Sequence, residues 1–212
     1  MNPLLIALLG VMVVPLFVAT WRVSLLGLSG QGFLMAMIAS SLVIEPRTAG
    51  DWLTMFDLVV VRGIAAPLTL YLVLRRRNIP TRLDVIPPSL LSWTVALGMV
   101  LVAFNVAEVL VPESGEPQTL VAVVVAGLLL GFLVLATRGG PLGQIVGVLR
   151  VENAVALFEL EGGHHDAPIA QQAALLALFV ATIAWLRWYL TTLSVHPHAA
   201  APTPVTVEGP TL

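Results

Sequence analysis

The chain has 212 residues, a formal net charge of -2, only 10% charged residues and a mean hydropathy of +0.97. This composition excludes an ordinary soluble domain. Apolar runs of about 20 residues, enough to cross a bilayer, recur along the sequence and predict an all-α polytopic membrane protein. The absence of cysteine excludes disulfides and thiolate-bound metal or iron–sulfur sites in this chain.

We expect about seven transmembrane helices, numbered here as spans 1 to 7. They cover residues 3–20, 23–44, 52–74, 89–111, 120–137, 142–160 and 169–190. Three units and a tail follow from this spacing. Residues 1–88 hold spans 1–3 and a cytoplasmic loop, 89–117 hold a linking helix (span 4) and an outer loop, and 118–192 hold the three helices of spans 5–7. The tail, 193–212, is rich in Pro, Ala and Thr and is expected to be disordered.

The arginines near the span ends predict the orientation. With seven spans, one side of the membrane receives Arg22, Arg75, Arg76, Arg77, Arg82, Arg138 and Arg187. The opposite side receives Arg47 together with Glu45, Asp51, Glu113, Glu116, Glu161 and Asp166. The positive-inside rule then places the N-terminus outside and the C-terminus in the cytoplasm of a multi-pass protein of the inner (plasma) membrane.

Span 3 carries two opposite charges within its apolar sequence, Asp57 and Arg62. Five residues separate them, so in an α-helix they point about 140° apart and are not expected to pair. Pro67 is predicted to open the hydrogen-bond ladder near Gly63. Two interpretations of Arg62 stay open: it holds an anionic partner or tunes a carboxylate, or it neutralises a carboxylate on another helix.

Span 6 carries an acidic residue at the depth where the bilayer is most apolar. A carboxylate at that position costs roughly 2.5–3.5 kcal/mol, so Glu152 is expected either to serve a proton or cation path or to form a structural pair. Asn153 follows about 100° round the helix, and Glu159 lies one heptad later on the same face as Glu152. These three residues are candidates for an ion path, although Glu159 lies near the outer end, where solvation is the alternative.

Two further charges lie within predicted spans. Arg150 is about 200° round the helix from Glu152, so it is expected to snorkel towards the cytoplasm or to meet a neighbouring subunit. Glu108, one turn after Asn105 towards the outer end of span 4, is interpreted as interfacial. Both residues remain candidates for buried charges or for pairing.

No motif points to catalysis or to a cofactor. His164, His165 and Asp166 form a short cluster in an outer loop, but no third histidine has ligand spacing, so a solvated loop is the better interpretation. The sequence contains no phosphate-binding glycine loop, no HExxH and no nucleophile motif. We therefore expect no catalytic residue, no metal site and no cofactor in this chain.

The segment from Arg138 to Leu160, RGGPLGQIVGVLRVENAVALFEL, resembles the middle helix of the NuoK-type subunit of complex I, also found as MrpC in multisubunit cation/proton antiporters. From about Thr20 to Leu190 the chain resembles hydrogenase-4 component E. That family supplies a membrane subunit of group 4 nickel–iron hydrogenase and formate hydrogenlyase-like complexes. The resemblance rests on the Glu152-Asn153 pair, on Arg62 with Pro67, and on the sequence RNIP at 77–80.

The resemblance implies a non-catalytic subunit that contributes to a proton or cation path and to membrane-arm assembly. Its implied partners are an antiporter-like large subunit, other membrane-arm subunits, and hydrogenase or iron–sulfur subunits that carry the electrons; no nucleic acid is implied. The chain departs from the NuoK pattern in span 7, where Gln171 and Gln172 stand nearest to the family's second acidic residue. Gln172 is kept as a path candidate, although an amide does not ionise.

Two alternatives stay open. In the first alternative the chain is a purely structural membrane subunit. In the second it is a small subunit of a multisubunit cation/proton antiporter or carbon-uptake complex without a redox partner.

Overall fold

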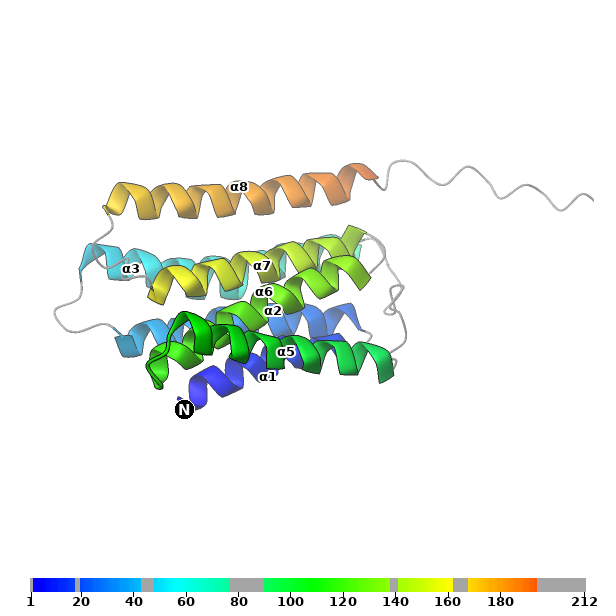
Figure 1. Ribbon diagram of the computed structural model, residues 1–212. Coiled ribbons are helices and arrows are strands. Elements are labelled where there is room, and N and C mark those ends of the chain that lie inside the picture. Colours follow the sequence, from blue (N-terminus) through cyan, green and yellow to red (C-terminus); the bar gives the residue numbers. More distant parts are fainter. Residues whose placement is uncertain are drawn as a thin grey trace, which may run out of the picture.

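Helices that run side by side make up the protein (Figure 1). The structure is a computed structural model and describes residues 2–17, 20–42, 48–76, 90–137, 141–161 and 168–193. Within these ranges the helices, in chain order, are α1 (Pro3–Phe17), α2 (Trp21–Leu42), α3 (Ala49–Phe56), the π-helix η1 (Asp57–Ala65), α4 (Ala66–Arg76), α5 (Leu90–Leu110), α6 (Glu116–Thr137), α7 (Pro141–Glu161) and α8 (Ile169–Leu193). The α3, η1 and α4 segments form one continuous rod, Ala49–Arg76.

Five of these helical segments are long and apolar enough to cross a membrane. They are Trp21–Leu42, Ala49–Arg76, Trp93–Leu110, Glu116–Thr137 and Ile169–Thr192. The predicted all-helical class and the multi-pass membrane character are thereby confirmed. Helices α1 and α7 lie at the positions predicted for spans 1 and 6.

The rod begins at a capping box that the sequence encodes locally. The backbone N–H of Asp51 donates to Thr48 Oγ1 at 3.3 Å, and the backbone N–H of Thr48 donates to Asp51 Oδ2 at 2.7 Å. These bonds satisfy backbone donors that the first turn of a helix leaves free. Asp51 therefore fixes the start of the rod.

Small residues let the helices approach closely. A Cβ added at Gly32 of α2 would lie 2.6 Å from the backbone nitrogen of Gly63 in η1, so the two backbones touch. Between α6 and α7, a Cβ at Gly131 would lie 2.7 Å from Val151 Cγ2, and one at Gly147 would lie 2.6 Å from Leu135 Cγ. Such contacts are the usual basis of helix association in membranes, and here they hold η1 against α2 and α7 against α6.

The buried side chains form two large apolar clusters with a polar layer between them. Along α2, Leu28 belongs to one cluster and Met35 to the other, and the buried Gln31 lies between them. Along α7, Leu149 and Ala156 belong to the same two clusters, with the buried Asn153 between them. The polar layer is thus placed midway along the helices.

Helix α8 lies at one side of the bundle (Figure 1). It packs mainly along α3 and α4 and less on α7, whereas α6 packs against α1, α5 and α7. Contacts therefore cross the limits of the predicted units 1–88 and 118–192, and that division of the chain stays a prediction.

Three predicted features lie outside the described residues. They are the RNIP sequence at 77–80, the cluster of His164, His165 and Asp166, and nearly all of the tail, from 194 to 212.

Candidate functional site

Arg62 and Asp57 form an ion pair, contrary to the expectation from an α-helix. Arg62 Nε donates to Asp57 Oδ2 at 2.8 Å, and Arg62 leaves 8% of its side chain exposed. The reason is η1: each N–H in a π-helix donates to the carbonyl five residues earlier, so residues five apart stack one turn apart. Pro67, just after η1, has no N–H to offer to the preceding turn, which favours a changed ladder at this place.

The same guanidinium joins η1 to α7 and, through α7, to α2. Arg62 Nη1 donates to the backbone carbonyl of Glu152 at 3.3 Å and to Asn153 Oδ1 at 3.2 Å. Asn153 Nδ2 then donates to Gln31 Oε1 at 3.2 Å. Asn153 and Gln31 are 2% and 1% exposed, so these bonds form in the dry interior, where an unmade bond is costly.

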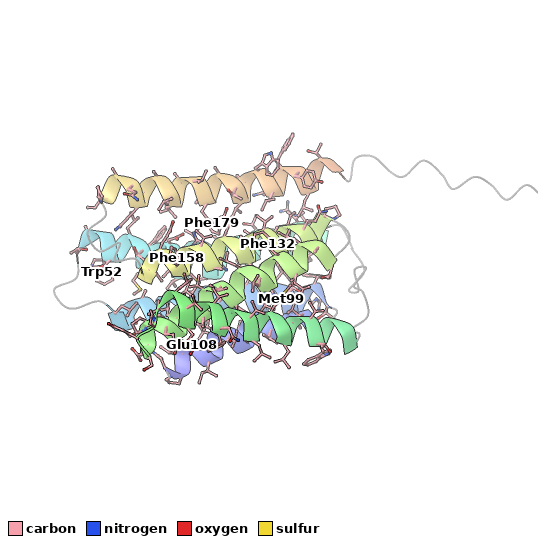
Figure 2. The ribbon with its side chains drawn as sticks, in the orientation of Figure 1. Trp52, Met99, Glu108, Phe132, Phe158 and Phe179 are labelled. Atoms are coloured by element: carbon pink, nitrogen blue, oxygen red, sulfur yellow. The ribbon has the colours of Figure 1, made fainter. Side chains whose placement is uncertain are left out.

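Helix α8 covers this series of hydrogen-bonded side chains with an aromatic ring. The ring of Phe179 lies 3.9 Å from Arg62 Cζ, a cation–π contact, and Phe179 is the labelled side chain between α8 and the bundle in Figure 2. Phe179 is 2% exposed, so the guanidinium is shielded on that side. One side chain therefore couples the position of α8 to the charge in the middle of the bundle.

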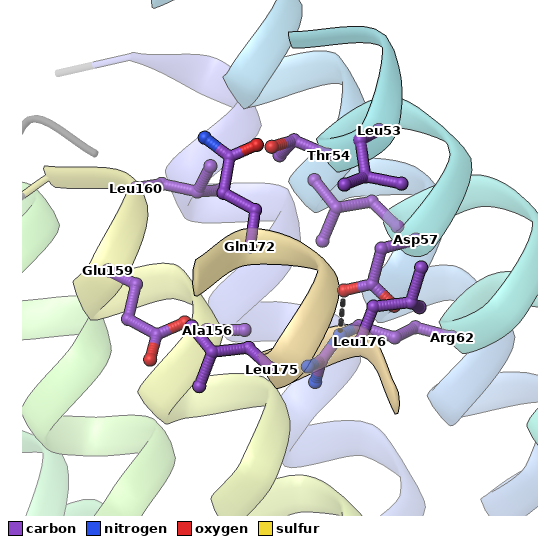
Figure 3. Close-up of a pocket in the computed structure, with 11 residues that line it drawn as sticks. Leu53, Thr54, Asp57, Arg62, Ala156, Glu159, Leu160, Gln172, Leu175 and Leu176 are labelled. Carbon is purple, nitrogen blue, oxygen red and sulfur yellow. Dashed lines mark hydrogen bonds and ion pairs between the residues drawn. The ribbon is translucent and has the colours of Figure 1, made fainter. Parts of the chain in front are cut away.

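A pocket of about 70 Å³ opens beside Asp57, between the rod, α7 and α8. Figure 3 shows the Asp57–Arg62 pair at its wall, with Glu159 and Gln172 on the other helices. The remaining lining residues are Leu53, Thr54, Leu58, Ala156, Leu160, Leu175 and Leu176. Asp57 Oδ1 is buried and has no hydrogen-bond partner in the described part of the chain. A pocket of this size, with several polar side chains in a mostly apolar wall, has room for water, which would satisfy that oxygen.

Glu152 lies close to this pocket. It is partly buried, and the charges that act on it are those of Arg62, Glu159 and Asp57. Ala156, one turn further along the same face, and Glu159 line the pocket. Two other carboxylates and one guanidinium thus act on Glu152, and the guanidinium pairs with Asp57; with every member ionised the group would carry a net charge of -2. A low-dielectric interior disfavours such a surplus, which protons, cations or a partner's positive charge can relieve.

The structure places the other two charge candidates away from this group. Arg150 is 3% exposed and donates from Nη1 to the backbone carbonyl of Met12 at 3.0 Å, so it joins α7 to α1 inside the same chain. The expectation that it snorkels or meets a neighbouring subunit is wrong, because a backbone carbonyl of α1 lies within its reach. Glu108 is exposed on α5, on the side of the bundle away from α8 (Figure 2).

The sequence analysis missed Gln31 and Phe179. Gln31 had a usable signal, since it is an amide inside an apolar span, LSGQGFL. Phe179 had none, because aromatic residues are ordinary in a membrane helix. Among the described residues there is no group of three or more side chains able to hold a metal ion.

Comparisons with protein families, with characterised proteins and with solved structures find no match to this chain.

Proposed function

We propose that this chain is an integral-membrane subunit of a complex I-like or group 4 hydrogenase-like respiratory complex. In this proposal Glu152, Glu159 and Asp57 contribute to a proton or cation path, and the chain helps to assemble the membrane arm. The observation that carries the proposal is that Glu152, Glu159 and Asp57 outnumber the single guanidinium of Arg62 that acts on Glu152, beside a pocket with room for water. Ionisable groups at such depth are costly and usually serve transport.

The proposed topology has seven spans, with the N-terminus outside and the C-terminus in the cytoplasm. Four exposed arginines support it: Arg22 lies at the start of α2, Arg75 and Arg76 lie at the end of α4, and Arg187 lies in the last two turns of α8. A reporter fused to the C-terminus should be active only in the cytoplasm. Activity on the outer face alone would contradict this orientation.

The test of the path is the Glu152→Gln variant in everted membrane vesicles that contain the whole complex. Proton uptake, followed with a pH-sensitive dye, should fall strongly, while native electrophoresis shows the complex still assembled. Glu108→Gln is the matched control, since it removes an exposed carboxylate on α5 and should leave uptake unchanged. Wild-type uptake in Glu152→Gln vesicles would remove Glu152 from the path.

The redox assignment is tested separately by co-purification. In the proposed assembly, a tagged chain extracted in mild detergent brings down subunits that contain nickel and iron. A complex with antiporter-like subunits but without these metals would favour the antiporter or carbon-uptake alternative.

A purely structural role is the second candidate. The bonds of Arg62 to α7 and of Arg150 to α1 favour it, because each joins two helices within the bundle. If that role is the only one, Glu152→Gln leaves ion coupling intact and Arg62 or Arg150 variants lower the yield of the complex.

A further inference from the structure

A groove separate from the Arg62 site runs between α2 and the η1–α4 part of the rod. Its volume is about 540 Å³, and its lining is almost wholly apolar: Leu25, Leu26, Ser29, Phe33, Gly63, Ile64, Pro67, Leu68 and Tyr71, with Arg22 at one end. Short side chains make the hollow, because Ser29 and Gly63 fill little space between the two helices. Arg62 itself points the other way, towards α7.

The groove opens to the lipid side along its length. Leu26, Phe33, Ile64 and Leu68 line it and leave between 42% and 69% of their surfaces exposed. No neighbouring element among the described residues covers these side chains. The hollow therefore suits a long apolar occupant that lies along the helices.

One end of the groove is aromatic and positively charged. The rings of Trp21 and Tyr71 lie 5.7 Å apart, and the guanidinium of Arg22 lies 5.4 Å from the Trp21 ring. Arg75 follows Tyr71 by one turn on the same face of α4 and is exposed, as is Arg22. The N-terminal end of α2 lies at the same place, and its macrodipole also favours an anion.

This arrangement is complementary to a phospholipid, because it has a positively charged end beside interfacial aromatic residues and an apolar channel that leads inwards. We propose that the groove binds an anionic phospholipid, with its phosphate at Arg22 and Arg75 and an acyl chain against Ser29, Gly63 and Pro67. Basic residues between transmembrane helices commonly recognise anionic headgroups. A partner helix would fill the apolar hollow, but it would not need the cationic side chain of Arg22 at one end of the groove, whereas a phospholipid headgroup does.

The test uses the full chain reconstituted in vesicles of equal parts phosphatidylglycerol and phosphatidylcholine. After extraction in mild detergent, native mass spectrometry counts the lipids that remain bound. The wild-type chain should retain phosphatidylglycerol in excess, and Arg22→Gln should lower that retention about fivefold, the effect of one cationic side chain at a membrane surface. Arg187→Gln is the matched control, because it removes an exposed arginine at the same end of the bundle but outside the groove.

A variant that fills the groove tests the proposed acyl-chain site independently of charge. Ser29→Phe should reduce retention of both lipids, and Leu68→Phe serves in its place if Ser29→Phe does not fold. Equal retention of the two lipids by the wild-type chain would overturn the proposal, and so would equal losses in Arg22→Gln and Arg187→Gln. A lipid-free dimer that Ser29→Phe dissociates would assign the groove to a second copy of the chain instead.

Discussion

Removing either member of the Asp57–Arg62 pair should destabilise the bundle by about 3–5 kcal/mol, because the remaining charge is left without its partner in the interior. In Arg62→Met the loss has several parts. Asp57, whose side chain is 17% exposed, loses its 2.8 Å ion pair, while Asn153 and the Glu152 carbonyl lose their donor. The cation–π contact to Phe179 also disappears and contributes about 0.5–2 kcal/mol of the total.

A double-mutant cycle separates the pair from its surroundings. Asp57→Asn and Arg62→Met are made singly and together, and unfolding in mixed micelles is followed by tryptophan fluorescence. The double variant should be more stable than the sum of the single losses predicts, with a coupling of about 1–3 kcal/mol. Asn105→Ala, an exposed change on α5, is the control and should stay within about 0.5 kcal/mol of the wild type. Losses that add to within about 0.3–0.5 kcal/mol would show that the two residues do not interact, and the π-helical geometry would be refuted.

Two other predictions concern how the site is held. Gly32→Ala puts a Cβ against the Gly63 backbone and should lower the free energy of unfolding by about 1–3 kcal/mol in the same assay. Gly98→Ala, with open space around it, should cause no measurable loss. Equal effects of the two substitutions would disprove the close approach of α2 and η1. Phe179→Leu should make α8 easier to detach, which is measured as faster proteolysis within residues 162–167, whereas Phe158→Leu, at an exposed position, should not. Similar proteolysis of both variants would mean that Phe179 does not hold α8.

The apolar runs in the sequence predict the helices well, because length and hydropathy alone select membrane-crossing segments. The sequence also points to Glu152, Asn153 and Arg62, because charged and amide side chains are rare within membrane-crossing segments. The spacing of apolar residues does not predict that η1 is a π-helix, which has more residues per turn than an α-helix. The 140° separation of Asp57 and Arg62 assumed an α-helix, and one π-helical segment turned two separate charges into a pair. The contacts of Arg150 with α1 and of Phe179 with Arg62 depend on which helices are neighbours, which a single sequence does not encode locally.

Gln172 offers the sharpest test of whether the pocket belongs to an ion path. Its side chain lines the pocket with Asp57 and Glu159 and packs on α3, where a Cβ at Gly50 would lie 2.9 Å from Gln172 Oε1. Gln172→Glu keeps the shape of the side chain and adds a carboxylate to a group that already has three for one guanidinium. If protons or cations pass here, the added charge should change the pH dependence of coupled proton uptake in everted vesicles.

Gln171→Glu is the matched control, because Gln171 is exposed on the same turn and does not line the pocket. A shifted pH profile for Gln172→Glu alone would support the path. Unchanged profiles in both variants, in complexes that assemble normally, would favour the structural role. The carboxylates near Arg62 would then serve only to hold helices together, and their surplus negative charge would be relieved by protonation of a carboxyl group or by a cationic group on a neighbouring subunit.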